Sequence, residues 1–357
     1  MTAARRAAAA VPDDDPAALV EQVARLFFEQ QLTKVEIAAR VGISRFRVAR
    51  LLDRALAEGV VRIEFRGAPA QDRDLGAAIA ERFGIRRCVV SASDEPGAMA
   101  RLGAGVVDGL LEPGESIGVA WGSTVARVVR AMPAREDPSI DVVQLAGSSD
   151  SLDATSDPGD VTRVFAERLG ATHHRLHAPA FVESPGLRDA LLRQPDVAAT
   201  IRRFDGLAIA LVGIGAFGGD GTSPRSSLVR SGALSAAETR RLARLGAVGD
   251  LIVHPFTADG VFVAPDLAER AIAIGIDELR RVPTVVAVAA GAGKLAAIRG
   301  ALATGVVAVL VTTAVSSTGG TSASAIRNIA RRKKVTRMPK PIVARFMLVQ
   351  SPGAGRG

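Results

Sequence analysis

Small and hydroxyl-bearing residues follow an apolar segment of the sequence in a pattern that suits anion binding. Trp121-Gly122-Ser123-Thr124 comes directly after the apolar residues 116–120 and opens an amphipathic helix. The free N–H groups at a helix N-terminus, together with nearby hydroxyls, bind phosphates and carboxylates. The sequence therefore predicts contacts between a small anionic ligand and Gly122, Ser123 and Thr124.

Lys294 is a second residue with phosphate-binding chemistry. It is the only lysine between Lys34 and Lys333, and it stands where the apolar residues 284–289 give way to another helix. A lysine ammonium at such a place can hold a phosphate as a point charge. The alternative is an exposed lysine at a helix start with no role in binding.

Two glycine patterns resemble nucleotide motifs without completing them. Gly213, Gly215 and Gly218 spell GxGxxG after the apolar residues 207–212, but a loop with Pro224 follows instead of a helix. Gly293-Lys294 lacks the serine or threonine of a phosphate-binding loop, since Leu295 follows. ATP or GTP binding is therefore not predicted, although glycines at such strand ends leave room for a small ligand.

The sequence offers no catalytic set and no metal site. His173, His174, His177 and His254 have no metal-ligand spacing matched by carboxylates or cysteines. No Asp, Glu or His lies in the loops at Gly122 and Gly291, so a placed acid or base is missing there. Asp259-Gly260 is typical of a turn, and a contact between Asp259 and a ligand is the alternative interpretation.

The elements that would position these residues alternate between helices and apolar strands. The expected helices are 72–83, 98–111, 123–131, 160–169, 235–245, 267–274 and 294–303, and the expected strands are 88–92, 116–120, 140–145, 207–212, 251–254, 284–289 and 306–311. Strands without polar alternation are buried on both faces, which predicts a mainly parallel α/β sheet covered by helices. Ligands of such sheets bind at the carboxyl ends of the strands, where the candidate residues stand.

An N-terminal segment has the order of signals typical of a helix-turn-helix. Thr33 and Glu36 form a capping box, Gly42 permits a turn, and Ser44 caps a second helix whose apolar stripe is Val48, Leu51, Leu52 and Ala55. The second helix would enter the DNA major groove, and the predicted DNA-binding residues are Thr33, Lys34, Ser44, Arg45, Phe46, Arg47 and Arg50. The alternative is a small helical domain with a solvated arginine face.

Composition favours a protein of two domains with a basic end. The chain has 357 residues and a net charge of +8, and residues 322–357 hold nine Lys/Arg and no Asp/Glu. One cysteine, no signal peptide and no apolar run of about 18 residues predict a cytoplasmic protein without a membrane partner.

Expected boundaries are 1–16 (disordered), 17–66 (all-α, winged helix-turn-helix, with residues 60–65 as the wing strand), 67–71 (linker), 72–315 (α/β) and 316–357 (basic tail). The tail could add sequence-independent affinity for DNA, or it could be a solvated appendage.

Together, the blocks LTKVEIAARVGISRFRVARLL, GVAWGSTV, QLAGS, AIALVGIGAF and VVAVAAGAGKLAAIRGALATGVVAVLVT resemble the SorC/DeoR type of bacterial sugar-responsive transcriptional regulators over about residues 17–315. The resemblance implies an effector domain similar to phosphosugar isomerases and deaminases, with no cofactor. It also implies a homo-oligomer, dimer or tetramer, whose affinity for operator double-stranded DNA changes when a sugar or sugar phosphate binds.

The resemblance places the effector contacts at Gly122, Ser123, Thr124, Gly147, Gly213, Gly215 and Lys294. Thr257 stands where the family usually has an F-D-x-x-G aspartate, which Asp259 could replace, and Thr313 stands where a T-D pair is usual. Two alternatives to an effector-controlled regulator stay open: a phosphosugar isomerase- or deaminase-like enzyme, and a DNA-binding regulator with a vestigial effector pocket.

Overall fold

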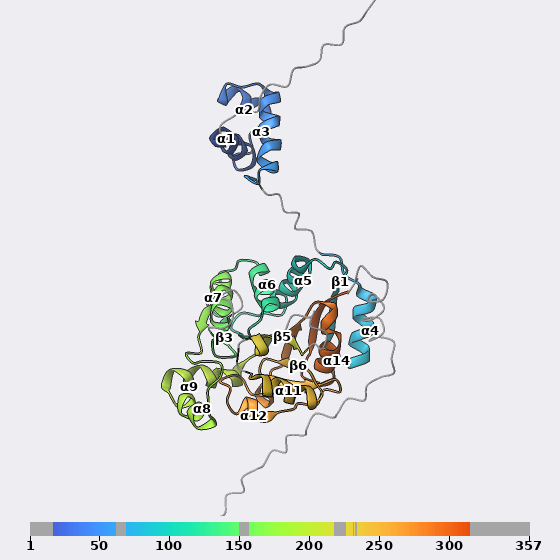
Figure 1. The fold of residues 1–357 in the computed structure, drawn as a ribbon. Coiled ribbons are helices and arrows are strands. Elements are labelled where there is room, and N and C mark those ends of the chain that lie inside the picture. Colours follow the sequence, from blue (N-terminus) through green and yellow to red (C-terminus); the bar gives the residue numbers. More distant parts are fainter. Residues whose placement is uncertain are drawn as a thin grey trace, which may run out of the picture. The chain divides into compact units, whose positions relative to one another are not determined.

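The structure is a computed structural model that describes residues 17–61, 69–149, 157–217, 226–230, 232 and 234–314. The chain divides into two compact units, Met1–Gly67 and Ala68–Gly357 (Figure 1). Each unit has a hydrophobic core of its own. The expected disordered N-terminus, the basic tail 316–357 and residues 62–65 of the expected wing strand lie outside the described residues, as do residues 67 and 68 of the expected linker.

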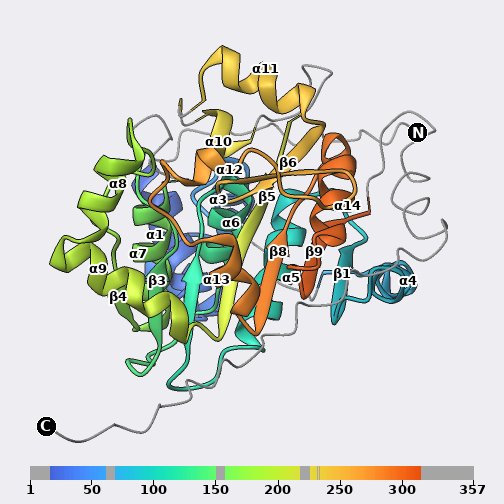
Figure 2. The same cartoon turned by 90° about the horizontal axis from the view of Figure 1, so that it is seen from below.

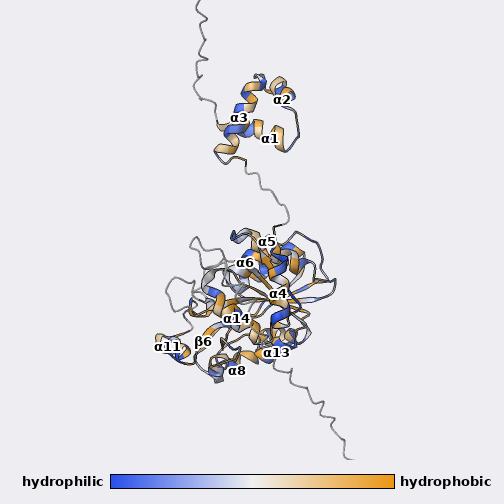
Figure 3. Cartoon of the chain, turned by 90° about the vertical axis from the view of Figure 1, so that its right-hand side faces the viewer, coloured by the Kyte–Doolittle hydropathy of each residue, from blue (hydrophilic) through white to orange (hydrophobic). Residues whose placement is uncertain are grey.

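Three helices form the described part of the first unit: α1 (Ala17–Phe28), α2 (Lys34–Val41) and α3 (Arg45–Ala57). The capping signals in the sequence act as expected, because Thr33 and Glu36 make a reciprocal capping box and the Ser44 hydroxyl accepts from the Arg47 N–H at 3.2 Å. Gly42 ends α2 with φ 75°, a left-handed conformation that suits glycine. Figure 3 shows hydrophobic and hydrophilic residues sharing α3, whose buried stripe packs on α1.

The second unit is built on a mainly parallel sheet with the strand order β1-β9-β8-β5-β2-β3-β4. The strands are β1 (Arg87–Ser91), β2 (Ser116–Val119), β3 (Asp141–Gln144), β4 (Thr172–His174), β5 (Ile209–Ala216), β8 (Thr284–Val288) and β9 (Val309–Thr313). All neighbours in this order pair in parallel. Figure 2 shows β1 and β4 at the two sides of the sheet. The predicted α/β class is confirmed for this unit.

Helices cover both faces of this sheet and make two separate cores. Helices α5 (Pro96–Asp108), α6 (Ser123–Ala131) and α7 (Pro158–Leu169) pack on one face. Helices α4 (Arg73–Phe83), α13 (Ile276–Arg281) and α14 (Leu295–Ala303) contribute to the core on the other face. The α6 bounds agree with the sequence prediction, and Asp72 caps α4 through the Leu75 N–H at 3.0 Å.

The prediction of a strand at 251–254 was wrong. These residues form the turn of an antiparallel hairpin between β6 (Ala247–Leu251) and β7 (His254–Thr257), and Ile252 has φ 61°. The apolar run is buried on all sides in the turn, so hydrophobicity alone could not distinguish it from a strand. The hairpin continues the sheet because β6 pairs antiparallel with β5.

Other boundaries also differ from the predictions. The expected helix 267–274 is reduced to α12 (Pro265–Ala268), because residues 271–274 form β-bridges and hydrogen bonds with the segments around Ala146 and Phe181. The remaining elements were not predicted from the sequence: α8 (Pro185–Leu192), α9 (Pro195–Arg202), η1 (Arg203–Gly206), α10 (Ser227–Arg230) and η2 (Ala292–Lys294). The helix α11 (Ala236–Arg244) is capped by Ser235, where the expected helix 235–245 begins.

Candidate effector site

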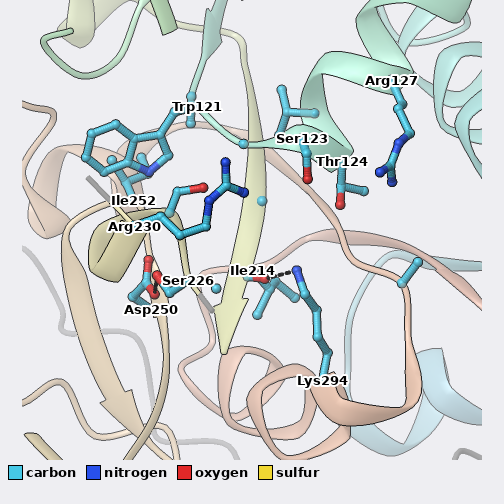
Figure 4. A pocket seen from close by; sticks show the side chains of 17 residues that line it. Trp121, Ser123, Thr124, Arg127, Ile214, Ser226, Arg230, Asp250, Ile252 and Lys294 are labelled. Atoms are coloured by element: carbon cyan, nitrogen blue, oxygen red, sulfur yellow. Dashed lines mark hydrogen bonds between the residues drawn. The ribbon is translucent and has the colours of Figure 1, made fainter. Parts of the chain in front are cut away.

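A cavity of about 150 Å³ lies where β2, β5, β6 and α6 meet in the second unit (Figure 4). Of the predicted effector residues, Gly122, Ser123, Thr124, Gly213, Gly215 and Lys294 line it. These residues are up to 172 positions apart in the sequence. They lie together because the parallel strands end at the same edge of the sheet. The fold therefore brings together the two segments that were predicted to bind a phosphate.

The N-terminus of α6 forms one wall of the cavity. Gly122 precedes the helix with φ 122°, and no side chain of the described residues caps it. The first N–H groups of a helix have no acceptor within the helix. They stand beside the hydroxyls of Ser123 and Thr124, so this wall offers donors to an anion.

Lys294 is partly buried, unlike the exposed lysine of the alternative interpretation. Its Nζ donates a hydrogen bond to the Ile214 carbonyl oxygen at 2.8 Å. Burial lowers the pKa of Lys294, whereas the charge of Asp250 acts in the opposite direction. The ammonium is thus fixed by β5 and faces a carboxyl group across the cavity.

Asp250 is the acidic residue of the cavity lining. It projects from β6, is 2% exposed, and accepts a short hydrogen bond from the Ser226 hydroxyl. Burial raises the pKa of Asp250 to about 7, while the Ser226 hydrogen bond and Lys294 oppose the rise. Gly215 makes this arrangement possible, because a Cβ at that position would collide with Asp250 and lie 2.6 Å from the Ser226 Oγ.

Two arginines complete the charged part of the described lining. Arg127 lies on α6, one turn after Ser123, and Arg230 ends α10. Figure 4 shows both guanidinium groups on the side of the cavity that Ser123 and Thr124 occupy, apart from the Asp250–Ser226 pair. Cations and free N–H groups therefore gather at one end and a carboxyl group stands at the other.

The prediction that the glycines of residues 213–218 follow the end of a strand was wrong for Gly213 and Gly215. Gly213 and Gly215 do not follow a strand but lie within β5, paired with Val288 and Asp250. The strand continues past Val212 because β6 supplies an antiparallel partner for its second half. Gly218 lies outside the described residues.

Gly147 and Asp259 are not among the residues that line the cavity. A Cβ at Gly147 would collide with the Pro179 backbone, so this glycine allows two segments to pack closely. Asp259 is 86% exposed in its side chain and pairs with Arg299 at 3.5 Å in the turn after β7, which agrees with the turn interpretation. Thr257 accepts from the Val261 N–H at 3.3 Å in the same turn, and Thr313 is buried at the end of β9.

Five polar residues of the cavity lining were not predicted from the sequence: Arg127, Ser226, Ser227, Arg230 and Asp250. Arg127 could have been found, since it follows Ser123 by one helical turn and shares its face. No local signal pointed to Asp250, because it reaches the cavity through the antiparallel pairing of β6 with β5.

The first unit presents basic residues on α3. Arg45 and Arg50 are exposed, and Phe46 is 70% exposed beside them. Lys34 is exposed at the start of α2, whereas Thr33 and Ser44 act as caps. The first acidic residue of α3 is Asp53, so every charged residue in its N-terminal half is an arginine.

No group of three metal-ligating side chains occurs within the part of the chain that the structure describes. In the same part, every helix is too short or too polar to cross a membrane.

Comparison with known proteins relates both units to one group. The family described as "Putative sugar-binding domain" matches residues 68–317. The sorbitol operon regulator of Klebsiella pneumoniae is 30% identical over 297 residues, which are 80% of this chain and 91% of that protein. The erythritol catabolism regulatory protein EryD of Brucella abortus is 29% identical, over 81% of this chain and 91% of its own length.

The crystal structure of the full-length sorbitol operon regulator SorC from Klebsiella pneumoniae has a similar fold. It superposes with a TM-score of 0.63 at 30% identity and covers 83% of this chain and 96% of that chain. The similarity therefore extends beyond the α/β unit alone.

Proposed function

Because the chain belongs to the SorC/DeoR-type family of sugar-binding transcriptional regulators, we propose that it controls carbohydrate genes by binding operator DNA and a sugar phosphate. The observation that carries the effector proposal is the cavity, in which the N-terminus of α6, two hydroxyls and two arginines face one end. Residues 17–66 are assigned to DNA, and residues 72–315 to the effector and to oligomer formation.

Charge complementarity supports a phosphorylated effector. Lys294 and Asp250 lie in the same lining, and Arg127 and Arg230 add two guanidinium groups to it. Two guanidinium groups match one phosphate dianion, and guanidinium–phosphate hydrogen bonds are charge-assisted. The carboxyl of Asp250 and the hydroxyl of Ser226 then face the remainder of the ligand, where sugar hydroxyls can donate and accept.

We expect a sugar phosphate to raise the melting temperature of the wild-type protein and to do so far less in Arg127→Ala. A ligand bound only by the folded state adds about 2.7 kcal/mol at a hundredfold excess over its Kd. A thermal-shift panel of sugar phosphates and the matching free sugars measures this. Arg130→Ala, on the same helix but outside the cavity lining, is the control. Equal shifts in the two variants would count against the phosphate site, and free sugars as good as their phosphates would count against the ligand class.

The proposal for DNA rests on the basic N-terminal half of α3. We expect Arg50→Ala to weaken operator binding about tenfold and to reduce its dependence on salt, because a lost phosphate contact releases fewer counterions. Arg25→Ala, an exposed arginine of α1 paired with Glu21 and Glu29, is the matched control. Fluorescence anisotropy across a salt series measures both effects, and an unchanged salt slope in Arg50→Ala would contradict the docking of α3.

Control of the operator requires a coupling free energy between the two units, which is about 1–3 kcal/mol in typical allosteric proteins. The same anisotropy titration with and without effector measures it directly.

Asp250 favours one alternative function, that of an enzyme. A buried carboxyl with a pKa near 7 in a ligand cavity suits proton transfer, which is the chemistry of a phosphosugar isomerase or deaminase. The relatives are named as regulators, and this favours binding without turnover. Incubating each ligand of the panel with the protein and following product formation distinguishes the two, since sustained turnover that Asp250→Asn abolishes would establish the enzyme.

A further inference from the structure

Phe46 is the most exposed large hydrophobic side chain of the described residues, at 70%. It is the second residue of α3, two positions after the Ser44 cap. The apolar stripe of α3, Val48, Leu51, Leu52 and Ala55, is buried against α1 and α2 without any contribution from Phe46. Packing within the first unit therefore gives no reason for an aromatic ring at this position.

The ring is paired with a cation on its own helix. The Arg45 Cζ lies over the Phe46 ring, 4.9 Å from its centroid. Such a cation–π contact holds a long, flexible guanidinium in one region of space. The helix cap fixes the backbone beneath both side chains, so Arg45 and Phe46 project from a rigid base.

The charge around Arg45 and Phe46 indicates which kind of partner surface they can bind. Arg50 is exposed on the same helix, and no acidic residue lies in the first turn of α3. A basic surface with one apolar ring fits a partner that is anionic but carries isolated apolar groups. In the DNA major groove, the only such group on the base edges is the 5-methyl of thymine.

The spacing of the pair matches two neighbouring base pairs. Stacked bases are about 3.4 Å apart, so a ring and a guanidinium about 5 Å apart can each meet one of two successive pairs. Arginine binds the O6 and N7 of guanine with two hydrogen bonds.

We propose that Phe46 reads the methyl group of one thymine in the operator, and that Arg45, held by the Phe46 ring, reads the guanine beside it. This inference rests on the proposed DNA-binding role of α3 and adds to it a named base step and the residues that specify that step.

The test begins with the full chain and a random duplex library. Repeated selection gives the operator, and each of its thymines is then replaced by uracil, which removes the methyl and keeps the Watson–Crick edge. At one position beside a guanine, uracil is expected to lower wild-type affinity about fourfold, the value of one buried methyl group. Phe46→Ala should lower affinity for the thymine operator to a similar degree and show no further loss with uracil.

Two variants separate the parts of the claim. Leu56→Ala removes an exposed apolar side chain about 15 Å further along the same helix, and it should keep full sensitivity to uracil. Phe46→Leu keeps an apolar group but loses the π face, so it should keep the sensitivity to uracil while its preference for the neighbouring guanine decreases.

Equal uracil sensitivity in Phe46→Ala and the wild type would overturn the proposal, as would an operator in which no thymine responds. A library from which nothing is enriched would instead overturn the DNA-binding function, and this inference with it.

Discussion

Gly215→Ala is expected to lower the free energy of unfolding of the second unit by about 3 kcal/mol, the combined cost of overpacking and a disturbed buried hydrogen bond. The new Cβ would collide with Asp250 and lie 2.6 Å from the Ser226 Oγ, near the end of β5. Asp250 is 2% exposed and accepts a hydrogen bond from Ser226, so a shift of its side chain would disturb that buried hydrogen bond. For a unit of this size the melting temperature should fall by roughly 10 °C.

Gly213→Ala is the matched control for this prediction. Gly213 lies on the same strand and the same face, two residues earlier, but its Cβ would meet only ordinary contacts at 3.6 Å with the Trp121 carbonyl oxygen and Val125. Denaturant unfolding followed by the fluorescence of Trp121, the only tryptophan and a residue of the second unit, measures both variants. The two variants should differ clearly in midpoint, and similar midpoints would show that Asp250 and Ser226 are not packed as described.

Asp250→Asn is expected to remove a large pH dependence of stability. The pKa of Asp250 is about 7 in the folded protein, against the ordinary value of 3.8 for an aspartate in the unfolded chain. The folded state therefore binds the proton more tightly, and the free energy of unfolding decreases as pH rises from about 4 to about 7, with no further change above that window. Over the window the decrease attributable to this group is on the order of 3–4 kcal/mol.

The asparagine variant carries no titrating group at this position, so its difference from the wild type isolates the effect of Asp250. Unfolding at pH 4.5 and pH 8 should show the variant gaining stability relative to the wild type as pH rises. Asp259→Asn is the control, because that carboxyl is 86% exposed and should leave the wild-type profile in place. A constant difference between Asp250→Asn and the wild type at both pH values would mean that the buried carboxyl does not titrate in this range.

The sequence by itself determined the features that depend on near neighbours. The capping box of Thr33, the turn at Gly42 and the Ser44 cap depend on residues at most a few positions apart, and the structure has all three. The observed bounds of α6 also agree with the predicted ones, because the helical spacing of its apolar residues and the preceding Gly122 define the helix locally. The α/β class followed from apolar strands that alternate with amphipathic helices.

Only the tertiary structure decided which residues share the cavity. Asp250 reaches it because β6 pairs antiparallel with β5 at Gly215, and the same pairing extends β5 beyond the predicted end at Val212. Residues 251–254 became a turn because the hairpin buries them on every side, where a local apolar run looks the same as a strand. Strand pairing joins positions that are remote in the chain, so no window of sequence contains the information that placed Asp250 opposite Lys294 or excluded Asp259 from the cavity lining.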